Sequence, residues 1–149
     1  MDVEQIIQTK SFHSQQQRTV IHLLLVGNRI SELVGQALKP FGVSMQQFNV
    51  LRILRGQKDT PSNLNTLNER MITRMSNTTR LVDKLLERGY VSRTVCASNR
   101  RKIEIMLTSA GSEVLSKMDT VVREVEHELM QNMTEEEMKT LNLLLNQIN

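Results

Sequence analysis

Apolar residues recur at helical spacing over long stretches near both ends of the chain, and this pattern constrains the fold more than any other feature. The first stretch covers about residues 14–38 and includes Val20, Ile30 and Val34. The second begins after Thr108, and its stripe comprises Val114, Met118, Val121, Val125, Leu129 and Met133. This spacing predicts two long amphipathic helices. A small domain between them cannot cover both stripes, so we expect them to pack in a dimer or in a closed monomeric bundle.

A second helix is predicted after a short break. Residues 39–42 contain Pro40 and Gly42, which end the first helix. Ser44 and Gln47 have the spacing of a capping box, which predicts that a new helix begins there. Its apolar pattern continues as far as Arg55.

The middle of the chain has the pattern of a helix-turn-helix. A short helix is expected over about residues 62–71, with Ser62 as its N-cap. A longer helix over residues 73–88 ends at Gly89. One face of the longer helix comprises Met75, Thr78, Leu81, Val82 and Leu85. The opposite face carries Arg74, Ser76, Asn77, Arg80 and Lys84. A tight turn followed by a helix that exposes small polar and basic side chains is typical of a DNA-reading unit.

A β-hairpin is predicted next. Residues 90–96 and 103–107 alternate or cluster apolar and β-branched side chains, which favours two short strands. The sequence Ser-Asn-Arg-Arg-Lys, residues 98–102, lies between them. A hairpin that follows a helix-turn-helix indicates a wing. Thr108 then caps the second long helix, and a capping box at residues 134–137 starts a last helix that carries Met138, Leu141, Leu145 and Ile148.

Positive charge is concentrated in one segment. The chain has a net charge of +3, but residues 70–102 hold nine Lys or Arg and two acidic residues, a net of +7. The remaining residues hold ten basic and fourteen acidic side chains, a net of −4. A basic segment on an otherwise acidic chain indicates a surface that binds a polyanion, with an ordinary solvated face as the alternative.

Composition excludes several classes of protein. The 149 residues suit a single domain over residues 1–149, and the one cysteine excludes an internal disulfide, which suits the cytoplasm. No apolar run reaches the length of a membrane span, and the N-terminus has no signal-peptide pattern. There is no glycine-rich phosphate loop or nucleophile elbow, and the three histidines lack the spacing of metal ligands. We therefore expect no enzyme, no metal site, no cofactor and no membrane partner.

Four segments in series resemble the MarR family of transcriptional regulators. They are residues 38–44 with 47–51, residues 67–71, residues 79–85 with 88–91, and residues 99–101 with 107–108. The resemblance covers essentially the whole chain. The departures are Asn68 where alanine is usual, Ile72 where glycine is usual, Cys96 and Asn99 where aspartate is common, and Ala97 where proline is common.

The resemblance implies a fold and a function. The fold is mainly α with a small β-hairpin wing: a winged helix-turn-helix at about residues 44–107, flanked by dimerisation helices at about residues 1–38 and 108–149. The implied function is a homodimeric regulator, favouring a repressor, that binds a pseudo-palindromic operator in double-stranded DNA and is released by a small molecule. The operator, the effector, the regulated genes and the choice between repression and activation are not given by the sequence.

DNA contacts are expected from two elements. On the recognition helix, Arg can pair with guanine and Asn with adenine in the major groove, while Thr suits phosphate contacts or helix surface. The candidates there are Arg74, Ser76, Asn77, Thr79, Arg80 and Lys84. Arg88 is expected to meet the DNA backbone or nothing. At the wing, Arg100 or Arg101 is expected to enter the minor groove and Lys102 to meet phosphate.

Sensing is expected in a crevice between the dimerisation helices and the winged domain. The resemblance implies a small, often phenolic or carboxylic effector, and the nine methionines would suit an adaptable apolar cavity. Residues placed to line the crevice are Phe12, His13, His22, Met45, Phe48 and Leu51, each with a core, surface or interface role as its alternative. Two alternatives remain for the whole chain: a thiol sensor that uses Cys96, and a helical interaction protein that has lost DNA binding.

Overall fold

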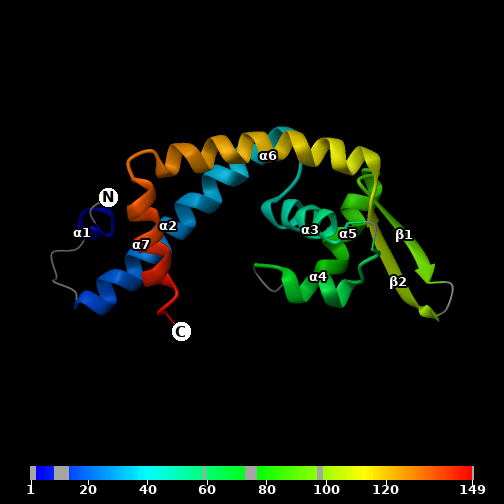
Figure 1. The fold of residues 1–149 in the computed structure, drawn as a ribbon, viewed down its shortest axis with the longest axis horizontal. Coiled ribbons are helices and arrows are strands. Elements are labelled where there is room, and N and C mark those ends of the chain that lie inside the picture. Colours follow the sequence, from blue (N-terminus) through cyan, green and yellow to red (C-terminus); the bar gives the residue numbers. More distant parts are fainter. Residues whose placement is uncertain (1–2, 9–13, 59, 73–76, 97–98, 149) are drawn as a thin grey trace.

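The computed structural model describes residues 3–8, 14–58, 60–72, 77–96 and 99–148, with backbone only at residues 96 and 99–102 (Figure 1). Most of these residues are helical, and they include one two-stranded antiparallel sheet. The elements in order are α1 (Val3–Ile6), α2 (Gln15–Leu38), η1 (Lys39–Phe41), α3 (Met45–Gly56), α4 (Leu64–Arg70), α5 (Thr78–Glu87), β1 (Val91–Cys96), β2 (Asn99–Leu107), α6 (Ser109–Met130) and α7 (Glu135–Leu145).

Side-chain caps begin the helices where the sequence predicts them. The capping boxes of α3 and α7 are both present: Ser44 accepts a hydrogen bond from the Gln47 amide, and Thr134 accepts one from the Glu137 amide. The Thr134 amide and hydroxyl in turn donate to the Glu137 carboxylate, and these bonds lower its pKa. Thr108 caps α6, as predicted. These contacts satisfy amides that the helix itself leaves free.

The start of α4 differs from the prediction that Ser62 is its N-cap. Asn63 holds that position, and its side-chain oxygen accepts from the Thr66 amide at 3.0 Å. Ser62 is instead buried, and its backbone exchanges two hydrogen bonds with Ile105, at 3.0 and 2.8 Å. Because Ser62 is held in extended conformation by β2, the helix can begin only beyond it.

The hairpin is longer on one side than predicted. β1 and β2 pair from Val91 opposite Leu107 to Val95 opposite Ile103, and the register then shifts so that Cys96 lies opposite Asn99. The prediction that the second strand begins at Ile103 is therefore wrong: β2 begins at Asn99 and includes the backbone of the basic residues 100–102. The basic residues 100–102 lie between these last two pairs, at the irregularity in the register.

A buried core holds the helix-turn-helix, the hairpin and the two long helices together. Its largest fully buried side chains come from six elements: Leu38, Leu51, Leu67, Leu85, Ile105, Leu115 and Met118. On α6 the predicted stripe is only partly right. Met118 is buried, but the other buried apolar side chains are Leu115 and Val122, while Val114, Val121 and Val125 lie at the edge of the core. The face of α6 that packs against the core is therefore rotated slightly about the helix axis relative to the predicted face.

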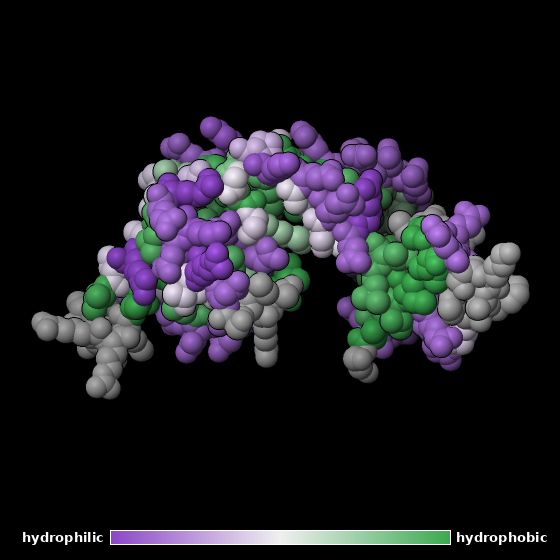
Figure 2. Space-filling model, turned by 180° about the vertical axis from the view of Figure 1, so that it is seen from behind, coloured by the Kyte–Doolittle hydropathy of each residue, from purple (hydrophilic) through white to green (hydrophobic). Residues whose placement is uncertain are grey.

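The far end of the molecule leaves many apolar side chains exposed. Val20 and Leu24 on α2 are 57% and 63% exposed, and Leu143 and Leu144 on α7 are 66% and 55% exposed. Figure 2 shows hydrophobic side chains gathered over the end of the molecule that holds α1, α7 and the start of α2. We call this end the arm, and the end that holds α3, α4, α5 and the hairpin the head. No described helix is long and apolar enough to span a membrane.

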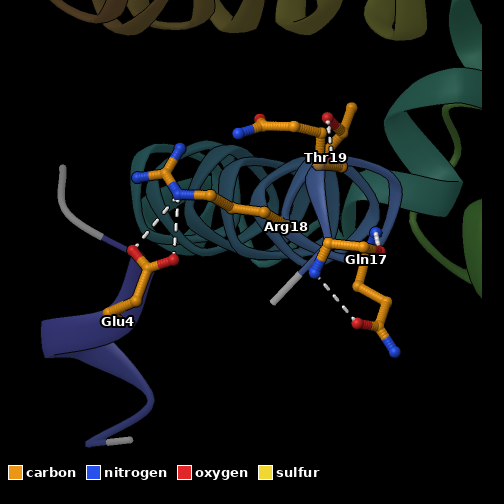
Figure 3. A network of polar contacts seen from close by, with 6 residues as sticks. Glu4, Gln17, Arg18 and Thr19 are labelled. Atoms are coloured by element: carbon orange, nitrogen blue, oxygen red, sulfur yellow. Dashed lines mark hydrogen bonds and ion pairs between the residues drawn. The ribbon is translucent and has the colours of Figure 1, made fainter. Parts of the chain in front are cut away.

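A short helix that the sequence did not predict, α1, lies beside α2 within the arm (Figure 3). Arg18 Nε on α2 donates to both carboxylate oxygens of Glu4, at 2.9 and 3.2 Å. Val3 is fully buried. Ser14 and Gln17 form a capping box at the start of α2 beside this ion pair. The ion pair and the burial of Val3 together attach the N-terminal segment to α2.

Candidate nucleic-acid interface

The helix α5 is amphipathic in the way that the sequence predicts. Thr78, Val82 and Leu85 are buried against the head. Arg80 and Lys84 are exposed, and since they are four residues apart they lie on one face. Thr79 is also exposed, and Asn77 is the exposed N-cap, with no side-chain hydrogen bond to the helix. Within the described part of the chain, neither Arg80 nor Lys84 pairs with a carboxylate.

Several predicted DNA contacts lie outside the description. The predicted helix starts at residue 73, whereas α5 is described from Thr78 and residues 73–76 are not described. Arg74 and Ser76 are therefore outside the described residues. The backbone of Arg100, Arg101 and Lys102 lies in β2, but their side chains are not described, and the same holds for Cys96 at the end of β1.

The two helices of the helix-turn-helix are joined by a polar contact that explains one departure from the family pattern. The Thr78 hydroxyl on α5 donates to Oδ1 of Asn68 on α4. Asn68 is the polar residue that stands where the family usually has alanine, and Thr78 is buried. The buried hydroxyl and the amide oxygen thus satisfy each other. Ile72, in the turn between the helices, is 81% exposed.

Two of the cations in the basic segment make contacts within the protein. Arg93 on β1 lies 3.4 Å from Asp83 on α5, which ties the wing to the helix and offsets one positive charge. Arg88 Nη1 donates to the Phe41 carbonyl at 3.1 Å. Arg80 and Lys84 therefore carry the positive charge that the described face of α5 offers to a ligand.

A cavity of about 300 Å³ lies between α3 and α6, where the arm meets the head. Its lining comprises Phe48, Arg52, Arg55, Asp119, Val122, Arg123 and Glu126. The Arg52 guanidinium lies 5.7 Å from the centre of the Phe48 ring, and Arg55 Nη1 forms an ion pair with Asp119. The cavity thus offers one aromatic ring and three guanidinium groups beside two carboxylates, a lining suited to an aromatic anion.

The six predicted crevice residues do not all come together. Phe48 lines the cavity, and Leu51 is fully buried in the core. His22 and Met45 are partly buried, and Phe12 and His13 lie outside the described residues. The sequence analysis missed Arg52 and Arg123. Arg52 follows Phe48 by one helical turn, a spacing that could have revealed it. Nothing in the local sequence indicates Arg123, because it comes from a distant helix.

Comparisons with known proteins give a consistent result. The model of the MarR family matches residues 43–103. The multiple antibiotic resistance protein MarR of Escherichia coli strain K12 is 27% identical over 131 residues, which cover 87% of this chain and 88% of that protein.

Solved structures agree with the sequence comparison. A MarR transcription factor from Planctomyces limnophilus is 29% identical, with a TM-score of 0.72 over 91% of this chain and 98% of that one. Bordetella bronchiseptica BpsR, whose DNA binding is regulated by 6-hydroxynicotinic acid, is 17% identical, with a TM-score of 0.79 over 93% of this chain and 97% of that one. The likeness confirms the predicted fold class.

Proposed function

The chain belongs to the MarR family of transcriptional regulators, and on that premise we propose that it binds an operator in double-stranded DNA as a homodimer and represses transcription. The observation that carries this proposal is the exposed cationic face of α5, formed by Arg80 and Lys84, next to a hairpin that contains three consecutive basic residues. A helix of this size fits the major groove, and a hairpin tip beside it can reach the minor groove.

Each contact has a role under this proposal. Arg74, Asn77 and Arg80 read base edges in the major groove, because Arg pairs with guanine and Asn with adenine. Ser76, Thr79 and Lys84 contact the backbone or the groove edge, and they set the register of the helix. Arg100 or Arg101 enters the minor groove, where a narrow groove concentrates negative potential, and Lys102 meets phosphate. Arg88 is left out of this set, because its guanidinium is bonded to the Phe41 carbonyl.

The arm provides the dimer interface in this proposal. Its exposed apolar side chains on α2 and α7 would lie against the same surface of a second copy. Burial of a leucine contributes about 1.5–3 kcal/mol, so a few such side chains on each copy are enough for stable association. Two copies related by a two-fold axis present two α5 helices to half-sites about one helical turn apart.

In this proposal a small effector releases the protein from its operator, and the effector binds in the cavity between α3 and α6. An aromatic ring would lie against Phe48, and a carboxylate would face Arg52 and Arg123. The regulation of BpsR by an aromatic carboxylic acid supports this choice of chemistry. The cavity lies between α3, which belongs to the head, and α6, which continues to the arm (Figure 1). A bound effector can therefore change the angle between the head and the arm. Aromatic carboxylates that release a bound duplex would support the assignment.

The proposal is tested with labelled duplexes that tile the region upstream of the gene. Their binding to the protein is measured by fluorescence anisotropy at several salt concentrations. If each protomer neutralises about four phosphates, the logarithm of affinity should fall against the logarithm of salt concentration with a slope of about −7. Tight binding to one imperfect palindrome, with this slope and a scrambled duplex as competitor, is the expected result. Weak binding that ignores sequence would instead favour an interaction protein that no longer reads an operator.

Replacing Leu24 by aspartate should dissociate the dimer. The Leu24 side chain is 63% exposed in a single chain, and under the proposal it is buried against the second copy. Because the interface is symmetric, the variant dimer would have to bury two carboxylates, one from each copy. We expect the dimer dissociation constant, measured by analytical ultracentrifugation, to rise at least ~100-fold. Ser116→Asp adds the same charge at an exposed polar position near the head end of α6, outside the proposed interface, and is the matched control. A dimer that survives Leu24→Asp unchanged would place the interface elsewhere.

A further inference from the structure

Arg88 occupies an unusual position for a basic residue of a DNA-binding head. It is the C-cap residue of α5, and its guanidinium donates to the carbonyl of Phe41, 47 residues earlier in the chain. Phe41 is the last residue of η1, which continues directly from α2. The final carbonyls of a helix lack partners within the helix and carry partial negative charge, so a cation there is favourable. The contact therefore joins the end of the predicted recognition helix to the end of the arm helix.

Gly42 makes room for this contact. Its φ is +61°, a left-handed conformation that suits glycine at the end of a helix. A Cβ at this position would lie 2.7 Å from Arg88 Nη2 and 2.9 Å from Nη1. The guanidinium therefore packs against the bare backbone of the turn. The left-handed turn at Gly42 thus leaves room for the exposed guanidinium beside the Phe41 carbonyl.

We call the junction between the C-terminal ends of α5 and α2, which the Arg88–Phe41 contact spans, the joint. The arm helix α2 has 24 residues, which corresponds to about 36 Å. A rotation of about 5° at its C-terminal end moves its far end by about 3 Å, close to the rise of one base pair. At the joint, Leu38 is buried in the core and Phe41 packs against the core, and α6 packs along α2. The Arg88 hydrogen bond adds a direct link from α5 itself, so it bears on the angle between the reading helix and the arm.

We propose that Arg88 is a positioning residue that sets the half-site spacing accepted by the dimer, by holding α5 at a fixed angle to α2 through the Phe41 carbonyl. This inference rests on the proposed function. It assigns to Arg88 an effect on which operators are accepted, without a contact to DNA. Loss of the Arg88 side chain loosens the joint. The dimer then loses less affinity for operators whose half-sites are not at the optimal spacing, while the same residues still read each half-site.

The experiment compares duplexes that carry two identical half-sites, selected with the wild-type protein, whose centres are moved apart or together by one and two base pairs. Affinities are measured by anisotropy for wild type, Arg88→Ala, Arg88→Lys and Lys39→Ala. Lys39→Ala removes an exposed cation next to the same joint and is the matched control. Melting temperatures establish that each variant is folded, which is expected because Arg88 and Lys39 are both exposed.

Wild type and Lys39→Ala should lose at least ~10-fold in affinity for a one-base-pair change of spacing, because each α5 is held in register with its half-site. Arg88→Ala should lose less than ~3-fold for the same change. Arg88→Lys should recover part of the selectivity, since an ammonium can still donate to the Phe41 carbonyl but lacks the planar fork. An Arg88→Ala profile as narrow as that of wild type would overturn the inference while leaving DNA binding intact. Absence of duplex binding by wild type would overturn the proposed function, and this inference with it.

Discussion

Replacing Arg100 and Arg101 together by alanine is expected to lower the affinity for the operator by about 10³-fold. The backbone of both residues lies in β2, at the tip of the hairpin (Figure 1), and the other strand of the hairpin, β1, packs against α5. Under the proposal one of the two arginines enters the minor groove in each protomer, so a dimer loses two such contacts, and at about 2 kcal/mol for each the loss is about 4 kcal/mol. The salt slope should also become shallower by about 0.9 for each phosphate contact that is lost. Anisotropy titrations of an operator duplex at several salt concentrations measure both quantities.

The matched control removes two cations far from the wing. Lys39 in η1 and Lys117 on α6 are exposed, and replacing both by alanine changes the net charge by the same amount. That variant should bind the operator within about threefold of wild type, since only contacts near the DNA release counterions. Circular dichroism and sedimentation should show both double variants to be folded dimers. If the wing variant binds as tightly as wild type, the wing does not read DNA and the proposed mechanism is wrong.

Replacing Gly111 by alanine is expected to lower the free energy of unfolding more than any other substitution proposed here. Gly111 is buried in the first turn of α6, and a Cβ there would lie 2.0 Å from the Tyr90 carbonyl oxygen and 2.9 Å from Leu107 Cδ1. The same carbonyl accepts a hydrogen bond from the Thr108 amide at 3.1 Å. The start of α6 must therefore move away from the Tyr90 backbone. We expect a loss of about 3 kcal/mol, the upper end of the usual cost of overpacking.

Urea unfolding at a fixed protein concentration measures this loss as a lower midpoint with an unchanged slope. In a thermal scan the same loss corresponds to a decrease in Tm of about 10 °C. Gly56→Ala, in the last turn of α3, is the matched control, because nothing lies within 4 Å of its Cβ position. That substitution should be neutral or stabilise the protein by up to ~1 kcal/mol. An equally stable Gly111→Ala protein would mean that α6 does not pack against Tyr90 in this way.

The candidate interface was predictable in outline from the sequence. The alternation of buried and exposed side chains on α5 follows from a spacing of 3.6 residues, so the exposure of Arg80 and Lys84 opposite Val82 was predictable. The fate of Arg88 was not predictable in the same way. Its charge and position on the helix are those of a backbone contact, yet its guanidinium is bonded to a carbonyl 47 residues away. Local spacing cannot distinguish a cation that faces solvent from one that faces another turn of the protein.

Local chemistry was sufficient for the order of the main helices and strands, α2 to α7 without the short η1, and for most of their ends. Ser44, Thr108 and Thr134 cap their helices and Gly89 ends α5, because capping and left-handed turns depend on atoms a few residues apart.

Packing between distant segments was responsible for the rest. It moved the start of α4 beyond Ser62, since β2 holds that residue in extended conformation. It also joined Thr78 to Asn68, placed Gly111 against Tyr90 and put Phe48 and Arg123 in one cavity. Each of these contacts brings together side chains or backbone from different elements, and their proximity arises only when the core is formed.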